Sequence, residues 1–182
     1  PGHSLSPDGG RMSLGDAPIA FMGEQIFDYL GHGVAAGDMD GDGLNDVMLG
    51  SYGAADFAGR VYVVLGSSID DEMTMDIGEA DYIFEGEAPN DEAGIITSSA
   101  GDVDGDGLDD LIVDAMYEKT VGASYTPTER SGSGKVYVVT AAELPAPGSL
   151  MALADVQRAW LAEGDGDGLV CATSPIGDVD GD

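Results

Sequence analysis

The sequence predicts an all-β protein made of β-propeller blades, which are four-stranded antiparallel sheets arranged around an axis. Three observations predict this class. An acidic segment occurs twice in full, apolar runs rich in β-branched residues follow each copy, and glycine-rich breaks separate the runs. The repeats amount to about two full and two partial blades, an incomplete ring because propellers typically have ~4–8 blades.

The composition narrows the class of protein further. The chain has 182 residues, with 6 Lys+Arg against 35 Asp+Glu, and a formal net charge of -29. A charge this negative argues against nucleic acid and anionic lipid as partners, since phosphates are repelled. No apolar run reaches the ~20 residues of a membrane span, so we expect no membrane insertion. Cys171 is the single cysteine, which excludes a disulfide framework; we expect it in a buried strand rather than as a catalytic thiolate.

Two units of the repeat can be aligned strand by strand. The runs VMLGSY and LIVDAM follow the acidic segments, and the runs GRVYVVLG and GKVYVVT come next. We therefore place strands at residues 31–37, 46–51, 60–65 and 81–85 of the first unit, and at 94–101, 110–115, 135–140 and 158–163 of the second. The second unit carries a polar insertion, residues 117–133, for which a mobile loop and a binding surface are equally open.

The units divide the chain into five expected segments. These are a leader or expression-derived segment (1–14), the outer strand of a preceding or ring-closing blade (15–30), blade 1 (31–92), blade 2 (93–166) and the truncated start of blade 3 (167–182). The run APIAFMGE, residues 17–24, matches the fourth strand of a unit. We expect further C-terminal blades, in the same longer chain or in another copy, with the last one pairing with this strand.

The acidic segment itself, GDMDGDGLND from Gly37, predicts a metal site. Alternating aspartates can aim their carboxylates inward from a curled loop, glycine permits the tight turn, and a backbone carbonyl and a final aspartate complete the donor set. Hard oxygen donors on a flexible loop suit Ca²⁺ better than Zn²⁺, Cu²⁺ or Mg²⁺. The candidate ligands are Asp38, Asp40, Asp42, Leu44 and Asp46 in the first loop; Asp102, Asp104, Asp106, Leu108 and Asp110 in the second; and Asp178, Asp180 and Asp182 in an incomplete third. We expect Asn45 and Asp109 to face solvent.

The acidic segment has two alternative interpretations. An EF-hand loop starts in the same way but requires a bidentate Glu at its twelfth position, where this chain has Leu49 and Val113, and helices rather than strands should follow it. A solvated turn without metal is the other alternative. The GDGDG segment with Asp165 and Asp167 lacks a third donor at the right spacing and is interpreted as such a turn.

The pattern D-x-D-x-D-G-x-x-D, followed by an apolar strand and a G-x-V-Y-V strand, resembles the FG-GAP repeat of the integrin alpha-subunit propeller. The resemblance covers the chain from about residue 15. Its Phe-Gly positions are Leu30-Gly31, Ala93-Gly94 and Asp167-Gly168 here, and its Gly-Ala-Pro positions are Gly50-Ser51-Tyr52 and Asp114-Ala115-Met116. The resemblance implies that calcium bridges the loop between the first two strands of each blade.

The functional hypothesis is a non-enzymatic, calcium-binding propeller module for adhesion or ligand recognition, outside the cell or at its surface, with a protein or glycan as ligand. A building block of an extracellular assembly and an accessory domain of a larger secreted enzyme are the alternatives. Weaker features are interpreted structurally. We expect His32 at the surface or packed, residues 131–135 (SGSGK) in a flexible turn, and the recurring aromatic residues Tyr62, Tyr137, Phe84 and Trp160 in the core.

Overall fold

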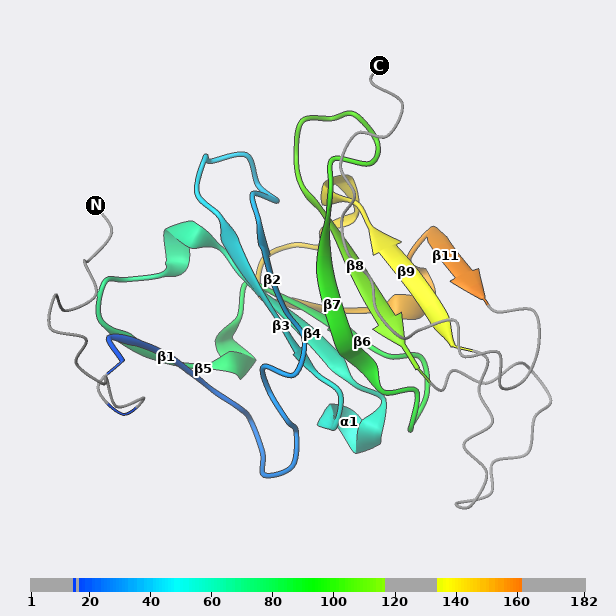
Figure 1. Ribbon diagram of the computed structural model, residues 1–182, viewed down its shortest axis with the longest axis horizontal. Helices are drawn as coiled ribbons and strands as arrows, with labels where there is room; N and C mark the ends of the chain where they lie inside the picture. The colour runs from blue at the N-terminus through cyan, green and yellow to red at the C-terminus, as the bar shows by residue number, and fades with distance from the viewer. Residues whose placement is uncertain (1–14, 16, 117–133, 162–182) are drawn as a thin grey trace, which may run out of the picture.

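The computed structural model describes residue 15, residues 17–116 and residues 134–161. In these residues the chain is dominated by β-strands, which form one two-stranded, one five-stranded and one four-stranded sheet (Figure 1). The predicted all-β class, with incomplete propeller blades, is confirmed. No helix in the described ranges is long and apolar enough to cross a membrane.

Each unit contributes four antiparallel strands, and we use the names blade 1 and blade 2 for these two sets. Blade 1 contains β2 (Val34–Gly37), β3 (Asp46–Ser51), β4 (Arg60–Val64) and β6 (Tyr82–Glu85), in the order β6-β4-β3-β2. Blade 2 contains β7 (Ala93–Gly101), β8 (Asp110–Ala115), β9 (Lys135–Val139) and β11 (Arg158–Leu161), in the order β11-β9-β8-β7. All eight predicted strands are therefore confirmed, with ends that differ by at most a few residues.

Three further strands link one unit to the next. β1 (Ile19–Met22) pairs in parallel with β5 (Met73–Asp76), and β6 pairs in parallel with β10 (Ser149–Ala152). β5 and β10 precede the fourth strand of their own units, so β1 lies relative to blade 1 as β6 lies relative to blade 2. β5 and β10 were not predicted from the sequence, because MTMD and SLMA are short and lack a β-branched run.

Short helical turns connect the strands. The turn α1 (Ala54–Phe57) joins β3 to β4, and Ala55 and Asp56 within it have left-handed backbone angles. Four single 3₁₀ turns complete the described elements: Gly66–Ser68, Ile77–Glu79, Ala141–Glu143 and Leu153–Asp155.

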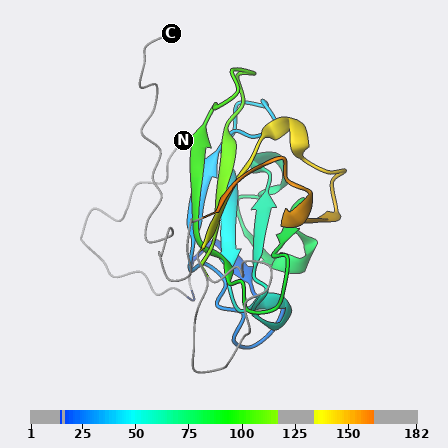
Figure 2. The same cartoon turned by 90° about the vertical axis from the view of Figure 1, so that its right-hand side faces the viewer.

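The main core lies between the two blades. Side chains alternate along a strand, so Val61 and Val63 of β4 face blade 2, where they pack with a cluster that includes Tyr137 and Val139 of β9. Tyr62 and Val64 of β4 face the other way, into a second cluster that includes Phe21 of β1. Blade 2 thus covers one face of blade 1, and the β1–β5 pair covers the other (Figures 1 and 2).

This stacking aligns the two acidic loops. Each loop joins the first and second strands of its blade, β2 to β3 and β7 to β8. Both loops lie at the upper end of the molecule in Figures 1 and 2, and α1 lies at the opposite end. The repeat therefore places its two candidate metal sites next to each other.

Candidate metal centre

The first acidic loop is shaped by hydrogen bonds from its own backbone. The Asp38 carboxylate accepts the N–H groups of Gly41 at 2.7 Å and Gly43 at 3.0 Å. Farther along, Asp40 accepts the N–H of Asp42 at 3.1 Å, and Asp42 accepts that of Leu44 at 2.7 Å. Gly41 and Gly43 have left-handed φ angles of 78° and 84°, which a residue with a Cβ rarely adopts. The sequence thus sets the curl of the loop locally.

The second loop repeats this arrangement. The Asp102 carboxylate accepts the N–H groups of Gly105 and Gly107 at 2.7 and 2.8 Å, and Asp106 accepts that of Leu108 at 2.9 Å. These backbone hydrogen bonds lower the pKa of Asp102 below its ordinary value, with the bond from Gly107 as the largest cause, because they favour the charged form.

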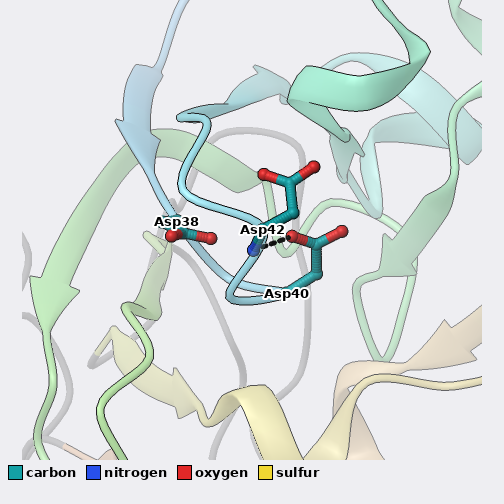
Figure 3. A group of neighbouring side chains, drawn as sticks. All are labelled: Asp38, Asp40 and Asp42. Atoms are coloured by element: carbon teal, nitrogen blue, oxygen red, sulfur yellow. Dashed lines mark hydrogen bonds between the residues drawn. The ribbon is translucent and has the colours of Figure 1, made fainter.

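Three carboxylates converge in each loop. Oxygens of Asp38, Asp40 and Asp42 lie within 4.8 Å of one another, and the same holds for Asp102, Asp104 and Asp106. Figure 3 shows the first group on its curled loop. The structure therefore brings together the first three candidate ligands of both complete loops, as the alternating spacing predicts.

The closing aspartates have a different environment from the other three. Asp46 is fully buried, and its two oxygens accept the N–H groups of Met39 and Gly66, both at 2.8 Å. Burial raises the pKa of Asp46 above its ordinary value, the two hydrogen bonds oppose this, and the charges of Asp40 and Asp38 add to the increase. Asp46 is therefore close enough to the other aspartates for their charges to affect it.

Asp110 has the equivalent position in the second unit, and its hydrogen-bond partners are the residues equivalent to those of Asp46. It is fully buried and accepts the N–H groups of Val103 at 2.8 Å and Ala141 at 2.9 Å. Burial is again the largest cause of a raised pKa. Asp46 and Asp110 thus fasten each acidic loop to the turn that follows the third strand of the same blade.

Counted from the first aspartate of each loop, the eighth residue is Asn45 in the first loop and Asp109 in the second. Both were expected to face solvent, and the structure corrects this for one of them. Asn45 is exposed, as predicted. Asp109 is not: it is half-buried, its Oδ2 accepts the N–H of Asp38 at 2.9 Å, and its own N–H donates to the Asp38 carbonyl at 2.8 Å. Nothing in the sequence indicates this contact, because it joins neighbouring units that are far apart along the chain.

The donor chemistry fits a hard divalent cation. Each cluster offers only carboxylate oxygens, and none of the salt bridges among the described residues reaches either cluster. Carboxylates this close repel one another unless a cation neutralises them. Ca²⁺ prefers six to eight oxygen ligands on flexible loops, so the residues present suit it. Of the two residues predicted to donate a backbone carbonyl oxygen, Leu44 is 50% exposed and Leu108 is half-buried.

Some predicted residues lie outside the described part of the chain. They are the third acidic loop with Asp178, Asp180 and Asp182, the GDGDG segment with Asp165 and Asp167, Cys171, and the insertion at residues 117–133.

The strand that follows each acidic loop excludes an EF-hand, and comparison with known proteins agrees with this. The FG-GAP repeat family matches residues 30–64 and 95–139, which contain both complete loops. These two segments are FG-GAP repeats. The chain is similar to integrin alpha-PS2 of Drosophila melanogaster, 32% identical over 108 residues, and to integrin alpha pat-2 of Caenorhabditis briggsae, 37% identical over 101 residues. Integrin alpha-5 of Xenopus laevis is 32% identical over 105 residues.

The similarity to integrin alpha subunits is local. The matched part covers 55, 53 and 53% of this chain but only 8, 8 and 9% of alpha-PS2, alpha pat-2 and alpha-5, respectively. The chain thus spans less than a tenth of the length of these relatives.

The structure explains two glycines of the FG-GAP signature. Gly50 is the glycine at the Gly-Ala-Pro position of the first repeat, and Gly94 is the glycine at the Phe-Gly position of the second. A Cβ at Gly50 would lie 2.0 Å from the Gly94 carbonyl oxygen, and Gly94 itself has a left-handed φ of 81°. The two FG-GAP units therefore meet through a backbone contact that no larger residue permits.

A polar cluster between FG-GAP units was missed by the sequence analysis. Glu24, just after β1, accepts hydrogen bonds from Arg60 at 3.0 Å and from the Tyr62 hydroxyl at 2.7 Å. The equivalent Glu87, after β6, accepts from Lys135 and from the Tyr137 hydroxyl. The signal was present, since Gly-Glu follows the fourth strand in both places.

Whether a recurring aromatic residue is buried depends on which unit it belongs to. Tyr62, Tyr137 and Phe84 are fully buried, as predicted, but Trp160 is 56% exposed. Phe84 packs in the core between blades 1 and 2. Trp160 occupies the equivalent place on blade 2, on the face where a following unit would lie. The prediction of a core role for Trp160 is therefore wrong for the described residues.

His32 lies at the surface, where it makes two contacts. Its Nδ1 donates to the Ile95 carbonyl at 2.8 Å, and its ring stands edge-on to that of Tyr52 at 5.0 Å between centroids. This contact ties the segment before β2 to β7 of the next FG-GAP unit.

Proposed function

We propose that this chain is part of a calcium-binding propeller that serves adhesion or ligand recognition, without catalysis, in a secreted or cell-surface protein. The observation that carries the proposal is the convergence of three carboxylates in two consecutive FG-GAP repeats. The integrin alpha relatives support the recognition role. We keep the expected blade boundaries, 31–92 and 93–166, as part of this proposal.

In the first repeat, the residues that would hold calcium are Asp38, Asp40 and Asp42, with the Leu44 carbonyl and Asp46 completing the donor set. Asp46 already accepts two backbone hydrogen bonds, but each carboxylate oxygen has a second lone pair available for a cation. The corresponding residues of the second repeat are Asp102, Asp104, Asp106, Leu108 and Asp110. Asp178, Asp180 and Asp182 would begin a third site.

Bound calcium would supply positive charge that offsets the repulsion within each cluster. Extracellular modules bind Ca²⁺ with Kd of about 10⁻⁴–10⁻³ M. With about 2 mM free calcium and a Kd of about 0.1 mM, each site would stabilise the fold by roughly 1.8 kcal/mol. At micromolar calcium the same sites would be empty. This dependence is the reason for proposing a location outside the cell or at its surface.

The ligand would be a protein or a glycan, recognised by connections of the propeller that calcium keeps rigid. The acidic surface makes nucleic acid an unsuitable partner. Other blades would complete the ring, in the same longer chain or in another copy.

The proposal is tested by counting bound calcium ions. Isothermal titration calorimetry on the full chain should show at least two sites, and the double variant Asp40→Asn/Asp42→Asn should lose one of them. The matched variant Asp104→Asn/Asp106→Asn should lose the other. Asp70→Asn/Asp71→Asn, which removes the same charge in a segment outside the acidic loops, should lose none. If all three variants lost the same number of calcium ions, the loss would reflect the general negative charge of the surface, and the proposal would be contradicted.

The recognition role needs a separate experiment. Surfaces coated with the chain should retain cells in millimolar calcium and release them in chelator. The combined variant Asp40→Asn/Asp104→Asn should retain few cells at any calcium concentration. If the unsubstituted chain and the variant retained cells equally, recognition would not depend on the calcium sites.

A further inference from the structure

We propose that Asp109, which belongs to the second acidic loop, is a positioning residue for calcium binding at the first loop and couples the two sites. This inference rests on the proposed calcium binding. It goes beyond it by assigning a role to a residue that the donor set does not include.

The contact between the loops is a pair of hydrogen bonds on a single residue. The Asp38 N–H donates to Asp109 Oδ2 at 2.9 Å, and the Asp38 carbonyl accepts the Asp109 N–H at 2.8 Å. Both backbone polar groups of Asp38 are thus held by Asp109, which fixes the backbone of Asp38 relative to blade 2. A bond from an N–H to a carboxylate is among the stronger hydrogen bonds in proteins.

Asp38 is also the residue around which the first loop curls. Its carboxylate accepts the N–H groups of Gly41 and Gly43, and one of its oxygens belongs to the converging cluster. A shift of the Asp38 backbone therefore moves a candidate ligand and the turn that holds the other ligands. In this way Asp109 acts on the metal site through Asp38, without contributing an oxygen to it.

Packing around these hydrogen bonds is tight. A Cβ at Gly37 would lie 2.8 Å from Asp109 Oδ2 and 2.9 Å from Asp109 Cβ, so only glycine permits the approach. A Cβ at Gly41 would lie 2.8 Å from the Leu108 side chain. Leu108 supplies a candidate carbonyl ligand to the second site. The same two residues, Leu108 and Asp109, thus belong to the second loop and pack on the first.

The coupling follows from this double role. Calcium bound through the Leu108 carbonyl would order residues 108–109 and so hold Asp38 in place for the first site. Thermodynamic linkage requires the reverse as well: calcium in the first loop must raise the affinity of the second by the same factor. Couplings between sites are typically ~5–150-fold.

The first repeat supplies its own control. Asn45 occupies the eighth position of the first loop, as Asp109 does in the second, but it is exposed. If the eighth position acted within its own loop, Asn45 would affect the first site. The structure assigns that effect to Asp109 instead.

The test is an NMR calcium titration of the full chain, with the Gly43 and Gly107 amides as separate reporters of the two loops. Asp109→Ala should weaken the affinity seen at Gly43 about tenfold, the factor that ~1.4 kcal/mol represents. Asn45→Ala should change it less than about twofold. Asp109→Asn retains an oxygen that can accept the Asp38 N–H, so it should lose less than about threefold.

Coupling is tested by emptying the second loop. Asp104→Asn/Asp106→Asn should weaken the affinity reported by Gly43 by about fivefold or more, although neither residue contacts the first loop through a hydrogen bond in the described structure. This readout does not move if Asp109 only supports the fold. It also keeps the proposal falsifiable if Asp109→Ala does not fold.

Three results would overturn the inference. They are an unchanged Gly43 affinity in Asp109→Ala, equal losses for Asp109→Ala and Asp109→Asn, which would mean that only charge acts, and an unchanged Gly43 affinity once the second loop is emptied. Failure of the proposed function looks different, because the unsubstituted chain would then show no saturable calcium shift at Gly43 or Gly107.

Discussion

The two acidic loops share most of their internal hydrogen bonds but have different surroundings. In both, the first aspartate accepts the N–H groups of two glycines and the closing aspartate is buried against two backbone N–H groups. Outside this shared frame the loops diverge. Met39 of the first loop is 1% exposed, whereas the equivalent Val103 of the second is 51% exposed.

The difference in exposure between the two loops follows the order of the units along the chain. Met39 and Phe84 of the first unit, which face the second, are buried, whereas their equivalents on the second unit, Val103 and Trp160, are exposed. At the eighth position the order is reversed, since this position faces the preceding unit: Asp109 is half-buried and Asn45 is exposed. The comparison teaches that the loop geometry is set within each repeat, while the contacts of each loop are set by its place in the array.

The largest expected effect tests the shared frame. Asp46→Ala and Asp110→Ala each leave one buried and one partly buried N–H group without their partner, so each should reduce the free energy of unfolding by about 3 kcal/mol. Urea unfolding in chelator measures this without any contribution from metal. The exposed Asp40→Ala should cost less than about 0.5 kcal/mol under the same conditions. A large difference between the Asp46 and Asp110 variants would break the equivalence of the two loops.

A smaller effect tests the contact between Gly37 of the first loop and Asp109 of the second. Gly37→Ala should cost about 1–2 kcal/mol, because its Cβ overlaps Asp109. The same substitution in an Asp109→Gly background should cost less than about 0.5 kcal/mol, since the overlapping side chain is gone. A double-mutant cycle from urea unfolding provides the measurement. Equal costs in both backgrounds would show that the loops do not touch in solution.

The polar clusters between units should give still smaller and matched effects. Glu24→Gln and Glu87→Gln each weaken a hydrogen-bonded ion pair that is only partly buried, so each should cost about 0.5–1 kcal/mol. Thermal unfolding at low salt checks this. A cost for only one of the two variants would show that the units use their Gly-Glu segments differently.

The pH dependence is expected to be the smallest effect, and it reverses with calcium. The pKa of Asp46 and of Asp110 is raised by burial above the ordinary 3.8. The calcium-free native state therefore binds more protons than the unfolded state above that pH, so stability should fall as the pH rises from 3.8 through the folded pKa values. The lowered pKa of Asp102 acts in the opposite sense, and its contribution is lost only as the pH falls below 3.8.

Urea unfolding between about pH 4 and pH 7 in chelator separates these contributions. Calcium favours the ionised carboxylates, so stability in millimolar calcium should instead rise over this range. Replacing Asp46 and Asp110 together by Ala should remove the decline seen in chelator. A decline that persists in the double variant would assign it to other acidic residues.

Much of the fold could be predicted from the sequence because it is local and repeated. The alternation of Val61, Tyr62 and Val63 indicates a strand with two buried faces, and the aspartate spacing places three carboxylates on one loop. β5 and β10 were missed, because their pairing with the fourth strand of the preceding unit depends on a neighbour and leaves little mark on four residues. Asp109 and Trp160 were misjudged for the same reason, since array position decides which of two equivalent residues is covered.

The central claim is that the two carboxylate clusters bind calcium and thereby stabilise the blades. The most direct measurement is thermal unfolding of the full chain across a calcium titration, beside the variant Asp40→Asn/Asp104→Asn. Two sites that contribute roughly 1.8 kcal/mol each should raise the Tm by about 7–14 °C at about 2 mM calcium, and the variant should lose most of this increase. An unchanged Tm, or an equal increase in the variant, would contradict the account.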